Sequence, residues 1–182
     1  MCLRTRGYAR TTARDLVAAS GTNLSSIGYH FGSKEALLAE AFDEVFEEWT
    51  ATLNSAARGN PGASALEAMG ASWRRMLDEL PDHSQLMLAF VESIGPSVRS
   101  PELREKLAEH YARTRTEVAK VVSDSLGEDS TADPEIVASF LIAIADGFMV
   151  QFLVDPHRLP TGEQLTSTLG AALAAALTPA GG

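Results

Sequence analysis

The 182-residue sequence predicts an all-α fold, with a small helical head at the N-terminus and a larger helical body behind it. Apolar residues recur every three or four positions through most of the chain, which is the spacing of helices that bury one face. Alternating β-branched residues, which would indicate strands, are missing, and short Gly, Pro and Asp clusters separate the periodic stretches. We assign residues 1–49 to the head and residues 50–182 to the body.

The head is predicted as short helices joined by tight turns. Thr12 can cap a helix that runs to about Ser20, and Gly21 supplies the left-handed stop. A second short helix fits residues 24–31, and the Gly-Ser pair that follows ends it and caps the next helix. The third helix carries an apolar stripe with spacings of 4, 3, 4 and 4, made by Leu38, Phe42, Val45, Trp49 and Leu53.

The body is predicted as five helices separated by glycine and proline. They are expected at residues 64–79, 83–94, 101–126, 134–154 and 162–177, with stops at Pro81, Gly95-Pro96, Gly127, Pro156 and Pro160.

The body helix at residues 134–154 is apolar on nearly all sides. Its two stripes are Val137, Leu141, Ile144, Phe148 and Phe152, and Ile136, Phe140, Ala143 and Gly147. A helix of this kind must be buried on two sides, and a chain of this size has limited room to enclose it. Small residues in the last helix allow close helix approach. We therefore predict a homodimer through residues 134–177, in preference to an internally buried hairpin.

Composition indicates a soluble globular protein, since 45% of the residues are hydrophobic and 21% are charged. The one cysteine, Cys2, excludes a disulfide framework and a cysteine-based zinc site. The sequence contains neither a run of about 18 apolar residues nor the apolar core of a signal peptide. We therefore expect a cytoplasmic protein without membrane contact.

Charge is distributed unevenly along the chain. The net charge is −9, but residues 1–34 hold five basic residues and one acid, whereas the rest holds 10 basic and 23 acidic residues. A basic head on an acidic body indicates that the head can meet phosphates while the body is repelled by them. A chance excess of basic residues is the competing explanation.

Residues 12–31 have the layout of a helix-turn-helix, which is two short helices joined by a Gly-containing turn. The second helix of such a motif lies in the major groove of DNA, so its outer residues must be small or polar. The outer residues would be Ser25, Ser26, Gly28 and Tyr29, with Ile27 and Phe31 packed inward. The alternative is a pair of short helices with solvated serines that never touch DNA.

The stretch TTARDLVAASGTNLSSIGYHFGSKEALL resembles the DNA-binding domain of the TetR family of one-component repressors. The segment GYHFGSKEALL carries the resemblance most specifically, and Arg6-Gly7-Tyr8 matches the end of the family's first helix. The later segments FVESIGPSVRSPELREKLAEHYARTR and IADGFMVQFLVDP resemble the sensor domain of one large TetR subgroup. The resemblance implies a repressor that binds double-stranded operator DNA as a dimer and is usually released by a small-molecule effector.

The resemblance also implies roles for individual residues. Thr12 matches a helix cap that touches a phosphate, and Arg14 matches a DNA contact on the same helix. Lys34 matches the lysine that holds the operator backbone at the start of the fourth helix. Ser25, Ser26 and Tyr29 match recognition-helix positions, and His30 matches a phosphate contact. The alternatives are a structural role for His30 and a packing role for Tyr29.

Two features depart from the family's pattern. Gly28 stands where the family usually has an aromatic residue that contacts DNA. Only Met1–Arg6 precede Gly7, so most of the family's first helix is missing. We favour a start site further upstream. The alternative function is a dimeric small-molecule-binding protein that no longer binds DNA.

The body is expected to hold a ligand pocket, because Met and aromatic side chains line adaptable apolar pockets. The candidates are Trp73, Met76, Leu77, Met87, Phe90, Val91, Tyr111, Phe148 and Phe152, each of which could instead belong to the core. Glu92 lies in the apolar run LMLAFVESIG. It either faces the pocket and favours a cationic or hydrogen-bonding ligand, or pairs with Arg104 or Arg115.

Nothing in the sequence indicates an enzyme. The four histidines are far apart, and none has the HExxH spacing of a metal site. The sequence has no GxSxG, phosphate-binding-loop or dinucleotide-binding motif. We therefore expect no catalytic residues, no metal and no cofactor.

Overall fold

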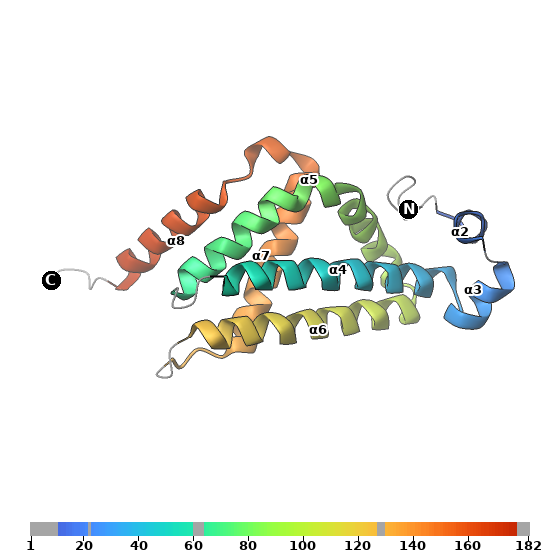
Figure 1. Ribbon diagram of the computed structural model, residues 1–182, viewed down its shortest axis with the longest axis horizontal. Coiled ribbons are helices and arrows are strands. Elements are labelled where there is room, and N and C mark those ends of the chain that lie inside the picture. Colours follow the sequence, from blue (N-terminus) through green and yellow to red (C-terminus); the bar gives the residue numbers. More distant parts are fainter. Residues whose placement is uncertain (1–10, 22, 60–63, 127–129, 178–182) are drawn as a thin grey trace. The chain divides into compact units, whose positions relative to one another are not determined.

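The structure is a computed structural model that describes residues 11–21, 23–59, 64–126 and 130–177. Within these ranges every regular element is a helix, as Figure 1 shows, and this confirms the predicted all-α fold. The elements are α2 (Ala13–Ser20), α3 (Leu24–Phe31), α4 (Lys34–Arg58), α5 (Ala65–Ser97), α6 (Pro101–Ser125), α7 (Pro134–Val154), the 3-10 turn η1 (Pro156–Arg158) and α8 (Gly162–Leu177).

The chain forms two compact units. Unit 1 comprises residues 1–49 and 81–114, and unit 2 comprises residues 50–80 and 115–182. Unit 1 therefore contains α2, α3 and one part each of α4, α5 and α6. Unit 2 contains the other parts of these three helices together with α7 and α8.

Unit 1 has an aromatic core where α4 meets α5. Phe42 and Phe46 on α4 lie edge-on to Phe90 on α5, with ring centres 6.0 and 4.9 Å apart. Leu38 on α4 and Leu103 on α6 are 1% and 0% exposed. Edge-to-face rings and buried aliphatic side chains thus hold the three helices of this unit together.

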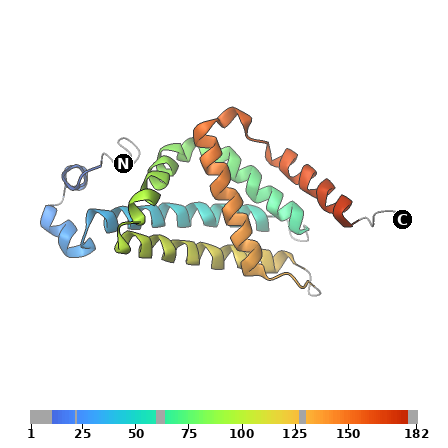
Figure 2. The ribbon, with the colours of Figure 1, turned by 180° about the vertical axis from the view of Figure 1, so that it is seen from behind.

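In unit 2, small residues let the helices approach closely. Ala57 of α4, Ala68 of α5 and Val121 of α6 form a buried cluster. A Cβ atom added to Gly70 of α5 would collide with Thr166 of α8. The first part of α5 and α8 therefore lie side by side, as the two opposite views show (Figure 1 and Figure 2).

The prediction of two separate helices at residues 64–79 and 83–94 is wrong, because a single helix, α5, runs through both ranges. It is continuous through both Pro81 and Pro96, so the predicted stops at Pro81 and Gly95-Pro96 are wrong. A proline inside a helix removes one backbone hydrogen bond and costs about 3 kcal/mol. Burial of Leu80 before Pro81 and Met87 after it, both 0% exposed, offsets this cost. Pro81 instead marks the point where the chain passes from unit 2 to unit 1.

Helix α7 has an apolar face that is exposed among the residues that the structure describes. Ile136, Phe140 and Val154 are 69%, 65% and 81% exposed, whereas Ala138 and Met149 are buried. The first two of these exposed side chains belong to the second stripe that the sequence analysis identified on this helix. This stripe is therefore available for contact with another surface.

In the described part of the chain, α7 is the helix that is long and apolar enough to cross a membrane, with a mean hydropathy of 2.1. The sequence analysis did not recognise it because Glu135 and Asp146 interrupt the apolar run. Core helices of soluble proteins can be equally long and apolar. The absence of membrane contact stays a prediction.

Candidate DNA-binding head and ligand cavity

The first described helix of the head, α2, begins with a reciprocal cap. The Thr12 hydroxyl accepts the Asp15 backbone N–H at 3.2 Å, and the Asp15 carboxylate accepts the Thr12 N–H at 2.9 Å and its hydroxyl at 2.7 Å. Gly21 ends the helix in the left-handed conformation, with φ of 68°. The predicted cap and stop are both confirmed, and they fix α2 before the turn to α3.

Helix α3 begins at a cap that the sequence analysis missed. Asn23 Oδ1 accepts the Ser26 backbone N–H at 2.8 Å and the Ser26 hydroxyl at 3.3 Å. Asparagine is among the best N-cap residues, so its place before the helix is the signal that could have identified it. At the other end, the Gly32 N–H donates to the Gly28 carbonyl oxygen at 3.1 Å. Both ends of α3 are thus fixed.

The outer face of α3 is polar and solvent-exposed. Ser25 and His30 are exposed, and Tyr29 is 87% exposed. The Tyr29 ring meets the His30 ring edge-on, with ring centres 5.0 Å apart. Gly28 faces open space, and Arg14 on α2 is also exposed. Small and polar groups on an exposed helix are what contact with base edges requires.

Two side chains that are predicted to contact DNA form hydrogen bonds within the head. The Thr12 hydroxyl is bonded to Asp15, and the Ser26 hydroxyl donates to Asn23. To donate to a phosphate, Thr12 must exchange its hydrogen bond to Asp15, whereas the Ser26 hydroxyl can still accept a hydrogen bond from a base. The side chain of Lys34 lies outside the described residues, although its backbone begins α4.

The inward face of α3 differs from the prediction. Phe31 is 36% exposed, so the expectation that it packs inward is wrong. It is the last residue of α3, and the chain turns at the glycine that follows, so no further turn of this helix covers its ring. The side chain of Ile27 lies outside the described residues, as do Arg6, Gly7 and Tyr8.

Within unit 1, charged groups join α4 to α6. The His110 Nδ1 and Asp43 Oδ1 atoms are 2.9 Å apart, and Arg113 binds the other Asp43 oxygen and reaches Glu47 Oε1 at 3.0 Å. Burial alone would raise the pKa of Asp43, but hydrogen bonds from Arg113 and His110 outweigh it and hold this pKa below its usual value of 3.8. These partners lie 66 to 70 positions apart in the sequence, so no local pattern predicts them.

The Asp43 pairing is expected to make stability depend on pH. Because the pKa of Asp43 is lower in the folded chain than in the unfolded chain, its stabilising effect is present above about pH 4 and is lost as the pH falls through the folded value. Asp43→Asn should lower the free energy of unfolding at neutral pH by about 1–3 kcal/mol and flatten its decline in acid. Urea unfolding at neutral and acidic pH measures both effects.

Asp124→Asn is the matched control for this prediction, because it removes a carboxylate that is 65% exposed and pairs with Arg58 at the surface. An Asp43→Asn variant with the stability and acid sensitivity of the parent would contradict the pairing.

The ten candidate pocket residues fall into two groups. Unit 1 holds Met87, Phe90, Val91, Glu92 and Tyr111, and unit 2 holds Trp73, Met76, Leu77, Phe148 and Phe152. The Phe90 and Tyr111 ring centres are 6.4 Å apart, and so are those of Trp73 and Phe148. The structure thus brings members together within each group. Met76 and Met87 are 2% and 0% exposed, which fits the alternative that these two are core residues.

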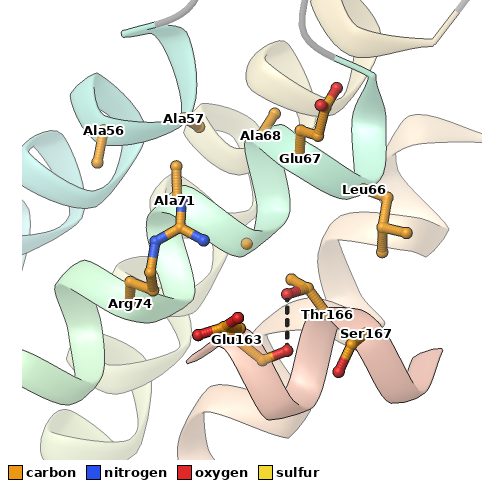
Figure 3. Close-up of a pocket in the computed structure, with 11 residues that line it drawn as sticks. Ala56, Ala57, Leu66, Glu67, Ala68, Ala71, Arg74, Glu163, Thr166 and Ser167 are labelled. Atoms are coloured by element: carbon orange, nitrogen blue, oxygen red, sulfur yellow. Dashed lines mark hydrogen bonds between the residues drawn. The ribbon is translucent and has the colours of Figure 1, made fainter. Parts of the chain in front are cut away.

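A cavity in unit 2 has a lining that the sequence analysis did not predict. Its volume is about 490 Å³, and it lies between the end of α4 and the starts of α5 and α8, as Figure 3 shows. The lining consists of small residues with a few charged and hydroxyl groups, namely Ala56, Ala57, Leu66, Glu67, Ala68, Gly70, Ala71, Arg74, Glu163, Thr166 and Ser167. The Thr166 hydroxyl donates to the Glu163 carbonyl oxygen at 3.2 Å (Figure 3). This volume lies in the range of small-molecule sites, and its lining lacks the Met and aromatic residues that guided the prediction.

Comparison with known proteins gives matches over most of the chain. Residues 65–178 match the family model described as BetI-type transcriptional repressor, C-terminal, and residues 1–41 match the model described as bacterial regulatory proteins, tetR family. The HTH-type transcriptional repressor DhaR of Mycobacterium sp. (strain GP1) is 23% identical over 171 residues, which are 92% of this chain and 85% of that protein.

Two solved structures have a similar fold. A transcriptional regulator from Pseudomonas aeruginosa PAO1 superposes with a TM-score of 0.73 at 22% identity, over 96% of this chain and 84% of that one. A transcriptional regulator from Saccharomonospora viridis in complex with choline gives a TM-score of 0.61 at 22% identity, over 95% of this chain and 90% of that one. At these identities the likeness concerns the fold alone.

Proposed function

Because the chain belongs to the TetR family of transcriptional repressors, we propose that it binds a near-palindromic operator as a homodimer and is released by a small-molecule ligand. The observation that carries this proposal is the exposed polar face of α3, held by caps at both ends. Double-stranded operator DNA is its partner, so the protein acts in the cytoplasm. Catalysis has no part in this function.

In the proposed complex, α3 is the recognition helix. Ser25, Ser26 and Tyr29 meet base edges, because their hydroxyls can both donate and accept hydrogen bonds. Thr12, His30 and Lys34 meet the DNA backbone and fix the register of the head, and Arg14 contacts the backbone or a base. Phosphate contacts of this kind supply affinity but no sequence information.

The homodimer is proposed to form through residues 134–177. The apolar stripe of α7 runs through Ile136, Phe140, Ala143, Gly147, Val150 and Val154, with spacings of 4, 3, 4, 3 and 4, and all of these except the half-buried Gly147 are exposed. This spacing is the seam of paired helices, and its small residues allow close approach. A second copy of the chain covers this face on each subunit, since closed two-fold dimers are the commonest oligomers.

Footprinting on the DNA around its own gene tests this function. The dimer should protect two half-sites whose centres lie about 34–36 Å apart or a multiple of one helical turn, because the protein two-fold must match the DNA repeat. Protection of a single half-site, or none, would contradict the proposal.

The ligand is proposed to be cationic or to donate hydrogen bonds, because Glu92 is a half-buried acid on α5 in the same unit as the aromatic candidates Phe90 and Tyr111. Glu92→Gln should weaken the binding of a cationic ligand by roughly 1–3 kcal/mol while leaving the fold intact. Titration calorimetry with choline and tetramethylammonium as probes measures this difference. Equal affinities for the variant and the parent would give Glu92 a structural role.

The two tryptophans distinguish the candidate ligand sites. Trp49 lies in unit 1 and Trp73 in unit 2, so Trp49→Phe and Trp73→Phe variants each report on one unit. Ligand bound beside Glu92 should change the emission of Trp49. A change confined to Trp73 would place the ligand in unit 2, where the cavity lies.

A further inference from the structure

Glu102 in the first turn of α6 touches the residue pair that joins α3 to α4. Its Oε2 atom accepts a hydrogen bond from the Ser33 hydroxyl at 3.0 Å. Its Oε1 atom lies 3.5 Å from the place that a Cβ atom on Gly32 would occupy. All three residues belong to unit 1, and this contact joins a helix of the body to the turn behind the recognition helix.

The Ser33 hydroxyl connects Glu102 to the start of α4. It donates its proton to Glu102 and accepts the Ala36 backbone N–H at 3.0 Å. A hydroxyl has one proton and two lone pairs, so donation to the carboxylate leaves a lone pair directed at the helix. Hydrogen bonds to an ionised acceptor are about twice as strong as neutral ones. Glu102 therefore fixes the rotation of the group that caps α4.

The turn at Gly32 needs such a contact to hold one conformation. Gly32 has φ of 74° and ψ of −50°. Glycine adopts this backbone conformation readily, but it adopts many other conformations just as readily. The position of α3 relative to α4 depends on these two angles and on the residues that follow. A side chain placed against this turn from α6 reduces the conformations that the turn can adopt.

We propose that Glu102 is a positioning residue for the recognition helix, which acts by holding the Gly32–Ser33 turn from α6. The proposal rests on the DNA-binding function above. A head that is already ordered loses less conformational entropy when it enters the groove, so the contact raises affinity for the operator. Displacement of the start of α6 breaks the contact and weakens DNA binding, which gives the body a direct route to the head.

A carboxylate near the head has an opposing effect, because it repels DNA phosphates. The sign of the change in affinity separates the two effects. Glu102→Ala removes both the charge and the acceptor, and Glu102→Gln removes the charge alone. Glu105→Ala is the matched control, because it removes an exposed acid three residues further along α6.

Fluorescence anisotropy with an operator fragment and with unrelated DNA tests the proposal. Glu102→Ala and Ser33→Ala should each weaken operator binding roughly fivefold, the equivalent of one net hydrogen bond, and the double variant should be no weaker than either. Glu102→Gln and Glu105→Ala should stay within about twofold of the parent. Affinity for unrelated DNA should not change, because only the positioning of α3 is lost.

Amide exchange in the absence of DNA provides a second readout. The Ala36 N–H should exchange faster in Glu102→Ala than in Glu105→Ala, because its acceptor hydroxyl is no longer held. A Glu102→Ala variant that binds the operator like the parent would overturn the inference and leave the function standing. If Glu102→Ala, Glu102→Gln and Glu105→Ala all bind the operator more tightly than the parent, Glu102 acts only by repelling DNA phosphates, and the inference is wrong. A parent protein that does not bind its operator would remove the function and this inference together.

Discussion

Phe140→Glu is expected to convert the dimer into monomer or aggregate. Phe140 is 65% exposed in the isolated chain and belongs to the α7 stripe, so the proposed dimer would bury the new carboxylate without a partner. Such a group costs on the order of 3–5 kcal/mol, and a two-fold interface contains it twice. The dimer dissociation constant should then rise by roughly four orders of magnitude or more. Light scattering over a range of concentrations measures the change.

Val98→Glu is the matched control for this interface variant. Val98 is 71% exposed and lies outside α7 and α8, so an added acid there should leave the dimer intact. Leu169→Glu on α8 should behave like Phe140→Glu. An unchanged dimer in both interface variants would remove the proposed interface. Co-sedimentation of the parent protein with lipid vesicles would assign the apolar face of α7 to a membrane instead.

Lys34→Ala and His30→Ala are expected to weaken binding to every DNA sequence alike. Both residues are proposed to neutralise or bind phosphates, and such contacts release counterions whatever the base sequence is. The loss of Lys34 should lower the slope of log affinity against log salt by about 1 per site. Titrations of operator and unrelated DNA at several salt concentrations measure both quantities.

Ser25→Ala and Ser26→Ala should instead change which base pairs are preferred, because contacts with base edges carry sequence information. Lys106→Ala is the control for the loss of positive charge, since Lys106 lies on α6 and pairs with Glu109 at 3.5 Å. A Lys34→Ala variant that binds DNA as well as the parent would contradict the assigned phosphate contact.

Local signals allowed most helix boundaries to be predicted. The Thr12 cap and the Gly21 stop depend on neighbouring residues, so the sequence contains the whole of each signal. The same applies to both ends of α7 and to the start of α8, which lie where the sequence predicted them. Asn23 was an equally local signal that the prediction overlooked.

Features that depend on distant residues could not be predicted in this way. Pro81 would end an isolated helix, but burial of side chains on both sides of it keeps α5 continuous. The contacts of Asp43 with α6 and of Ser33 with Glu102 join residues 66 or more positions apart. The cavity of unit 2 arises where alanine and glycine residues of three helices meet, and such residues give no distinctive pattern in sequence.

The central claim is that the head binds DNA, and a salt titration of the parent protein tests it most directly. Fluorescence anisotropy with DNA from around its own gene should show one dimer bound per palindromic site. Affinity should fall steeply as salt rises from about 50 to 200 mM, because each phosphate contact releases counterions. Unrelated DNA should bind at least about 1,000-fold more weakly. Absence of salt-dependent binding to this DNA would contradict the account and leave a dimeric small-molecule-binding protein.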